Sequence, residues 1–128
     1  MGVTYDNLGE YRRAIELYEK RLEIAHRIGD VQGEVMTLGN MGLAYANLGE
    51  YRRAIELYQQ SMEIARRIGD IHGEGNGLAN MGVAFSKLGK EDNCRECLLA
   101  ARAIFERLGL EHMVRQVERM MKSCGVKE

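Results

Sequence analysis

An internal repeat constrains this chain more than any other feature of its sequence. The segment Leu8–Tyr18 recurs letter for letter forty residues later as Leu48–Tyr58. Residues 1–40 and 41–80 are identical at about two-thirds of positions, and a weaker third copy starts at Met81. Repeats of this length form solenoids, in which each unit buries its apolar face only by stacking on its neighbours. Any function is therefore expected on a surface that several repeats build together.

Composition favours an all-α protein. Proline and tryptophan are absent, apolar residues make up 45% of the 128 positions, and charged residues make up 29%, values typical of a globular helical chain. The formal net charge is −1. Because a nucleic-acid partner requires a surplus of Lys and Arg to neutralise phosphates, we expect no nucleic-acid binding.

No segment points to a membrane or to an oxidising compartment. No apolar run approaches the roughly 20 residues of a membrane helix, and the N-terminus lacks a signal-peptide pattern. The three cysteines are an odd number, so we expect reduced thiols and no disulfide framework. The expectation is a cytoplasmic protein without a membrane partner.

Apolar residues recur with the three-and-four spacing of amphipathic helices. A helix is expected from residue 11 to 28, with a buried face made of Tyr11, Ala14, Ile15, Tyr18, Leu22, Ala25 and Ile28. Gly9-Glu10 is expected to form a turn before it, Gly29 to end it in a left-handed conformation, and Asp30 to cap the next helix. Further helices are expected at residues 31–47, 51–68, 71–87, 91–108 and 111–123.

These elements predict one domain over residues 1–128. Its repeat units are expected at residues 1–29, 30–69 and 70–109, and the first unit lacks the start of its first helix. A last helix at 110–124 is expected to cap the array through its apolar side, which consists of Leu110, Met113, Val114, Val117, Met120, Met121 and Cys124.

The repeated positions resemble the tetratricopeptide repeat consensus, with a small residue and an aromatic in each helix and a Leu-Gly turn between them. In the middle unit these are Gly42, Tyr45, Leu48, Gly49, Tyr51, Ala54 and Tyr58. In the first unit they are Gly2, Tyr5, Leu8, Gly9, Tyr11, Ala14 and Tyr18. The resemblance implies a helical-repeat solenoid of about three antiparallel helix pairs with a C-terminal capping helix.

The sequence also departs from that consensus. The usual proline after the second helix is absent and the unit is longer, as in the repeats of the Pins/LGN cell-polarity adaptors, the kinesin light chains and bacterial signalling proteins, which it resembles. A consensus alanine is replaced by Arg21 in the first unit and by Ser61 in the second, and the third unit has Glu91, Cys94 and Leu98 in place of Tyr, Ala and Tyr. The packing of helices is expected to differ at these positions.

The resemblance implies that the first helices of the units line a concave groove that binds a peptide segment of a partner protein. Helical spacing selects its lining residues, which in the middle unit are Met36, Asn40, Leu43 and Asn47, with equivalents at Val3, Asn7, Asn76, Asn80, Val83 and Lys87. Asparagine is a poor helix former, but its amide donates and accepts hydrogen bonds at once, which suits a peptide backbone. Alternatively, these asparagines bridge neighbouring helices or face water.

One end of the groove is expected to be basic. If the last helix is aligned on its apolar positions, Arg115 and Arg119 join the same surface as Lys87, with Lys122 as a further candidate. Such an end predicts a ligand with acidic residues or a free carboxylate.

Other motifs are interpreted structurally. Cys94 and Cys97 form a C-x-x-C, but no further zinc ligands stand at suitable spacing. The glycine-rich residues 72–77 lack the Gly-Lys-Ser/Thr of a phosphate loop and are expected to fray their helix. No metal or catalytic role is expected for the histidines, which are His26, His72 and His112. Arginine pairs are expected on a solvated face, with Arg52 near Glu56 and Arg67 near Glu63.

The sequence therefore predicts a non-catalytic protein–protein interaction scaffold without a cofactor. The alternative is a structural or self-assembling fragment of a larger signalling regulator with such repeats, without a ligand of its own. Its exposed repeat ends are then covered by the rest of a longer array or by pairing with a second copy.

Overall fold

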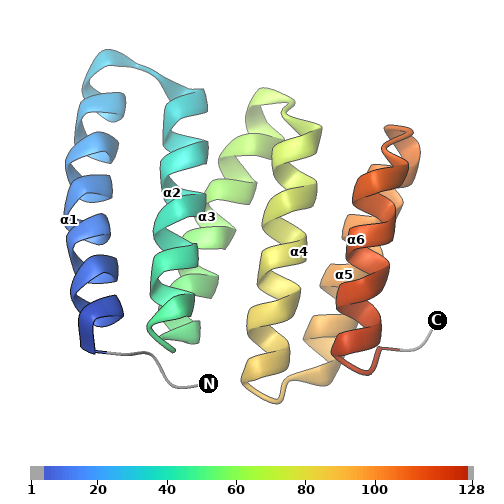
Figure 1. Cartoon of the computed structure of the whole chain (residues 1–128). Coiled ribbons are helices and arrows are strands. Elements are labelled where there is room, and N and C mark those ends of the chain that lie inside the picture. Colours follow the sequence, from blue (N-terminus) through green and yellow to red (C-terminus); the bar gives the residue numbers. More distant parts are fainter. Residues whose placement is uncertain (1–4, 127–128) are drawn as a thin grey trace.

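The computed structural model describes residues 5–126, with side chains from Leu8 onward, and the described residues form six helices and no strand. The helices are α1 (Tyr5–Ile28), α2 (Val31–Asn47), α3 (Tyr51–Ile68), α4 (Ile71–Lys87), α5 (Glu91–Arg107) and α6 (Glu111–Ser123). Each helix packs mainly on its neighbours in sequence, and α2, α4 and α6 lie in front of α3 and α5 (Figure 1). The predicted all-α helical-repeat solenoid is confirmed.

Helix boundaries agree with the prediction except at two places. The helix α5 ends at Arg107, one residue earlier than predicted. The predicted turn at Gly9-Glu10 is wrong, because α1 runs through it without a break and Gly9 does not have a positive φ. At the equivalent Gly49, φ is 81° and the full-length helix α2 folds back onto α3. The same Leu-Gly-Glu sequence thus lies inside a continuous helix at residues 8–10 and in a turn at residues 48–50.

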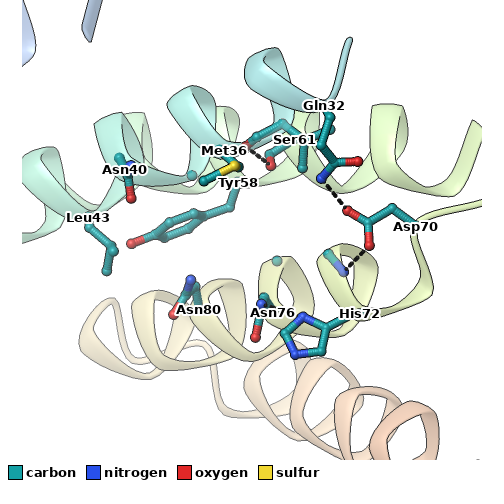
Figure 2. A pocket seen from close by; sticks show the side chains of 14 residues that line it. Gln32, Met36, Asn40, Leu43, Tyr58, Ser61, Asp70, His72, Asn76 and Asn80 are labelled. Carbon is teal, nitrogen blue, oxygen red and sulfur yellow. Dashed lines mark hydrogen bonds between the residues drawn. The ribbon is translucent and has the colours of Figure 1, made fainter. Parts of the chain in front are cut away.

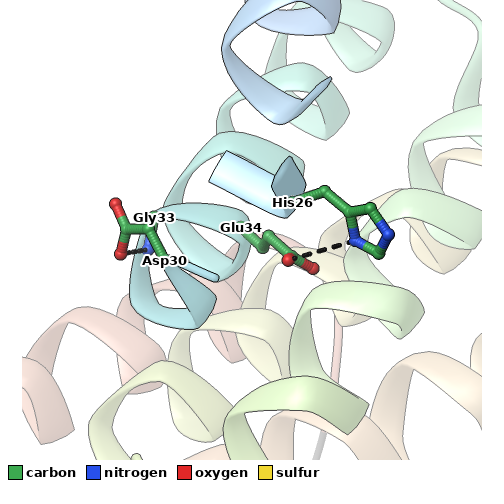
Figure 3. A network of polar contacts seen from close by, with 4 residues as sticks. All are labelled: His26, Asp30, Gly33 and Glu34. Carbon is green, nitrogen blue, oxygen red and sulfur yellow. Dashed lines mark hydrogen bonds and ion pairs between the residues drawn. The ribbon is translucent and has the colours of Figure 1, made fainter. Parts of the chain in front are cut away.

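The hinge between α1 and α2 has the predicted geometry. Gly29 is left-handed, with φ at 74°, and the Asp30 carboxylate accepts a 2.9 Å hydrogen bond from the Gly33 N–H, which caps α2 (Figure 3). His26 Nδ1 lies 3.4 Å from the Glu34 carboxylate across the hinge.

The hinge between α3 and α4 repeats this arrangement with one exchange. Asp70 caps α4 by accepting a 2.9 Å hydrogen bond from the Gly73 N–H. Arg66 stands in the place of His26 and lies 3.1 Å from Glu74. The same spacing of residues thus produces the same hinge in both places.

Glycines allow the helices to approach one another closely. A Cβ atom at Gly42 of α2 would lie 2.5 Å from Cε1 of Tyr58, a ring that is almost wholly buried between α2, α3 and α4. In α4, Gly75 faces Phe105 and Gly77 faces Met62. The glycine-rich start of α4 is thus a packing surface within a continuous helix, and the expected fraying of this helix stays a prediction.

The predicted buried faces are confirmed along most of the chain. In α6, Val117 and Met121 are buried, and the remaining predicted residues pack against the same core, namely Leu110, Met113, Val114, Met120 and Cys124. The exception is Ile28, which is 69% exposed. As the last residue of α1, it lies at the hinge where the chain turns away.

The exposed arginines form ion pairs, with different partners from those predicted. Arg53, rather than Arg52, pairs with Glu56 at 2.9 Å. Glu63 accepts a 3.4 Å hydrogen bond from Gln59. Such exposed contacts stabilise a protein by less than about 1 kcal/mol each, so this surface contributes little to stability. None of the helices formed by residues 5–126 is long and apolar enough to span a membrane.

Candidate functional site

A cavity of about 370 Å³ lies between α2 and α4, above side chains of α3 (Figure 2). Five residues predicted from helical spacing line it: Met36, Asn40 and Leu43 from α2, and Asn76 and Asn80 from α4. Because Met36 and Asn76, like Asn40 and Asn80, stand forty residues apart, stacking of the repeats brings equivalent positions to opposite sides of one space. We call this space the central cavity.

The base of the central cavity is formed by two residues of α3 that sequence reasoning assigned only to packing. Tyr58 points its hydroxyl into the cavity (Figure 2), and burial raises the pKa of Tyr58 to about 12. The phenol therefore stays protonated at neutral pH and can donate a hydrogen bond. The hydroxyl of Ser61 donates a 2.7 Å hydrogen bond to the Val35 carbonyl and is thereby fixed against α2.

The asparagines differ in whether their amides are already engaged. The side-chain nitrogen of Asn76 lies 3.1 Å from His72 Nδ1, one turn earlier in α4. Within residues 8–126, no protein hydrogen bond engages the side-chain amide of Asn40 or Asn80. Of the two expected alternatives, a bridge between helices therefore does not describe Asn40 and Asn80, whereas Asn40 is exposed and faces water and Asn80 is half-buried.

At one end of the central cavity, a polar contact joins two repeats. The Gln32 amide donates a 2.8 Å hydrogen bond to the Asp70 carboxylate. This bond, together with the one from the Gly73 N–H, lowers the pKa of Asp70, so the carboxylate is ionised at neutral pH. Sequence reasoning missed Gln32 and His72 as lining residues, although both stand one helical turn before a predicted one, Met36 and Asn76 respectively.

Two further cavities lie on either side of the central one. Between α1 and α2, a cavity of about 290 Å³ is lined by Asn47, and also by Asn40 and Leu43, which line the central cavity as well. Between α4 and α6, a cavity of about 480 Å³ contains Val83, Lys87 and Arg119. The three cavities follow one face of the array, along α2, α4 and α6, and we call them together the groove.

Some predicted residues lie elsewhere. Arg115 borders a separate cavity beside Glu106 and Glu111, because the first turn of α6 packs against the end of α5. Lys122 borders another, beside Glu118. Of the three basic residues considered in the last helix, only Arg119 thus lies in the groove. Val3 and the side chain of Asn7 lie outside the described residues.

The cysteines have the environment of structural residues. Cys94 is 1% exposed, and burial raises its pKa to about 11, with a further contribution from the neighbouring thiol of Cys124. Burial also raises the pKa of Cys97. A reactive thiol needs a lowered pKa, so these thiols are poor nucleophiles. All three cysteines are free, and no group of His, Cys, Asp and Glu in the described part of the chain could hold a metal ion.

Comparison with known proteins agrees with this architecture. The family model described as Tetratricopeptide repeat matches the chain twice, at residues 1–67 and at residues 33–107. The match does not show whether the repeat is of the long form found in the Pins/LGN adaptors and kinesin light chains or of the ordinary form. No curated protein matches the chain. Together the two matches cover most of the sequence, and the chain belongs to the tetratricopeptide repeat family.

Proposed function

We propose that this protein is a non-catalytic scaffold that binds a peptide segment of a partner protein along the groove. Tetratricopeptide repeats generally mediate protein–protein interaction. The observation that carries the proposal is the pair Asn40 and Asn80, whose amides lie on opposite sides of the central cavity (Figure 2) and are not engaged by the described protein groups. Each amide can donate to a peptide carbonyl and accept from a peptide N–H.

Apolar side chains beside these amides provide anchoring points. Met36 is 63% exposed and Leu43 is 45% exposed, and both line the central cavity. An exposed methionine adapts its shape to different apolar partners at little cost. The groove therefore suits a segment that presents its backbone to the asparagines and one or two apolar side chains to Met36 and Leu43.

The charges along the groove suggest how the segment is oriented. Lys87 and Arg119 line the cavity between α4 and α6, where none of the lining residues is acidic. Glu10 lines the cavity at the opposite end, between α1 and α2. Complementary charge sets the direction of a bound chain. We propose that the acidic end of the partner segment lies beside α6.

We place this interaction in the cytoplasm and assign the groove no cofactor, nucleic acid or membrane partner. Three free cysteines suit a reducing compartment. The formal net charge of −1 provides no excess of positive charge for a phosphate backbone.

A random peptide library displayed on phage tests the proposal, because it offers the groove many different segments at once. We expect immobilised protein to enrich peptides that combine apolar and acidic residues. These peptides should lose binding to a protein with Asn40→Ala and Asn80→Ala, and keep it with Arg52→Ala on the exposed face of α3. Circular dichroism establishes that each variant is folded. Equal binding of the selected peptides to the double variant and to the unchanged protein contradicts the proposal.

A further inference from the structure

The hydroxyl of Tyr58 has no hydrogen-bond partner within the protein, although the residue is almost wholly buried. Tyr58 is 2% exposed, and no described group within residues 8–126 hydrogen-bonds to its oxygen. In the described part of the chain, every side-chain nitrogen or oxygen that is completely buried has such a partner. The Tyr58 oxygen is therefore open to the central cavity, where it points toward the end formed by Asn40, Leu43 and Asn80 (Figure 2).

A segment that covers the central cavity separates this hydroxyl from water. The loss of water as a partner costs free energy unless the segment supplies a hydrogen-bond acceptor. Burial raises the pKa of Tyr58 to about 12, so the phenol is protonated at neutral pH and donates. Because Tyr58 belongs to α3, which lies behind α2 and α4 (Figure 1), a side chain of the segment reaches it more easily than the backbone does. The cavity of about 370 Å³ has room for such a side chain.

The charges of the central cavity disfavour a charged side chain beside Tyr58. None of the described residues that line the cavity is Lys or Arg, so a carboxylate buried there would have no cation to pair with. Asp70 is the one carboxylate among them, and it stands ten residues before Asn80, about 15 Å away along the helix axis. His72 lies at the same end as Asp70 (Figure 2). A buried ammonium or guanidinium beside Tyr58 would therefore lack a counter-ion as well.

Given the proposed function, on which this inference rests, we infer that Tyr58, Asn40 and Asn80 together bind the carboxamide side chain of a Gln or Asn residue in the partner segment. A carboxamide is neutral and both accepts and donates. Its oxygen accepts the hydrogen bond from the Tyr58 hydroxyl, and its nitrogen donates to the side-chain oxygen of Asn40 or Asn80. The two asparagines keep their own N–H groups for the peptide backbone. Leu43 packs against the methylene groups of the inserted side chain.

The neighbouring repeats lack the same site. The residue forty positions after Tyr58 is Leu98, which is 0% exposed and has no hydroxyl. The residue forty positions before it is Tyr18, which lines the cavity between α1 and α2 but is only half-buried. A buried hydroxyl without a partner is thus a property of the central cavity, and the carboxamide identifies which residue of the segment lies between α2 and α4.

The variant Tyr58→Phe tests the inference, because it removes the hydroxyl and keeps the ring. Since the hydroxyl has no protein partner, the variant should unfold at the same temperature as the unchanged protein. A random peptide library selected on the unchanged protein should enrich Gln or Asn at one position, and selection on Tyr58→Phe should lose this preference. The control is Tyr51→Phe, since Tyr51 lines none of the groove cavities, and selection on it should keep the preference.

Calorimetry then measures one selected peptide beside a version in which its enriched Gln is replaced by Met, or its enriched Asn by Leu. Tyr58→Phe should weaken binding of the selected peptide about five- to tenfold. The apolar version should bind Tyr58→Phe at least as tightly as it binds the unchanged protein, because the variant no longer has a hydroxyl to leave unpaired.

The outcomes separate this inference from the proposed function. If binding needs Asn40 and Asn80 but the selected peptides show no preference for Gln or Asn, or bind Tyr58→Phe as tightly as the unchanged protein, the inference is overturned and groove binding stands. Enrichment of Lys, Arg, Asp or Glu at the position sensitive to Tyr58→Phe overturns it in favour of a charged side chain. A lower unfolding temperature of Tyr58→Phe overturns it by showing that the hydroxyl is paired within the protein. Selected peptides that bind equally after Asn40→Ala and Asn80→Ala contradict the proposed function itself, and with it this inference.

Discussion

The side-chain amide of Gln32 donates a 2.8 Å hydrogen bond to the carboxylate of Asp70, and so joins the first turn of α2 to the N-cap of α4. The other carboxylate oxygen accepts the Gly73 N–H at 2.9 Å. One side chain thus caps a helix and links two repeats. The next repeat has no such link, because the residue forty positions after Asp70 is Leu110. The contact fixes the spacing of α2 and α4 at one end of the central cavity.

Removal of this carboxylate should cost more stability than removal of the corresponding cap in α2. Asp30 caps α2 through Gly33 alone, and Asp30→Ala should lower the free energy of unfolding by about 1 kcal/mol. Asp70→Ala also removes the link to Gln32 and should cost about 0.5–1.5 kcal/mol more. Urea denaturation of the two variants measures the difference. Equal losses would show that the link between repeats contributes nothing.

Stability should depend on pH through the same residue. The hydrogen bond from Gln32, and then that from the Gly73 N–H, lower the pKa of Asp70 in the folded protein. A lowered folded-state pKa contributes stability above the ordinary Asp pKa of about 3.9, and this contribution is lost as the pH falls through the folded value. The stability difference between the unchanged protein and Asp70→Asn should therefore shrink in acid below about pH 4. A difference that is constant from neutral pH downward contradicts this expectation.

Two glycines of α2, one turn apart, should respond oppositely to alanine. A methyl group at Gly42 would meet Tyr58 at 2.5 Å, whereas at Gly39 its nearest neighbour would be Ser61 at 3.8 Å. Gly42→Ala should destabilise the protein by about 1–3 kcal/mol through overpacking. Gly39→Ala should stabilise it by up to about 1 kcal/mol, because alanine favours a helix. Thermal unfolding compares the two, and a destabilising Gly39→Ala would mean that α2 and α3 are closer than described.

A third glycine tests the continuity of α1. Gly9 lies inside this helix, and a Cβ atom there would meet nothing within 4 Å. Gly9→Ala should therefore raise helix content and stabilise the protein by about 0.5–1 kcal/mol. Gly49, with φ at 81°, is the matched control, and Gly49→Ala should destabilise. If Gly9→Ala also destabilises, a turn forms at Gly9 as the sequence suggested.

The sequence predicted helices well where local signals and packing agree. As predicted, left-handed Gly29 ends one helix and Asp30 caps the next, and Gly69 and Asp70 repeat this arrangement forty residues later. The turn predicted at Gly9 is wrong, although the same Leu-Gly sequence forms a turn at Gly49. This short sequence therefore does not determine a turn by itself.

The sequence predicted some of the residues that line the groove and missed others. Helical spacing predicted that Asn40 and Asn80 share one surface, and both line the central cavity because they belong to helices of equal length and phase. Their role in binding stays a prediction. For the last helix, the alignment on apolar positions predicted that both Arg115 and Arg119 line the groove. Arg119 does so, whereas Arg115 lies beside the end of α5. Tyr58 was assigned to packing, and that is correct for its ring, but spacing along α2 and α4 cannot reveal a hydroxyl that enters the cavity from α3.

The affinity of one library-selected peptide, measured by calorimetry, tests groove binding most directly. The dissociation constant is compared between the unchanged protein and the variant with Asn40→Ala and Asn80→Ala. We predict that the double variant binds at least about tenfold more weakly, a loss of about 1.4 kcal/mol or more. Unchanged affinity, with both proteins equally folded, would show that the peptide does not bind between α2 and α4 and would contradict the proposed function.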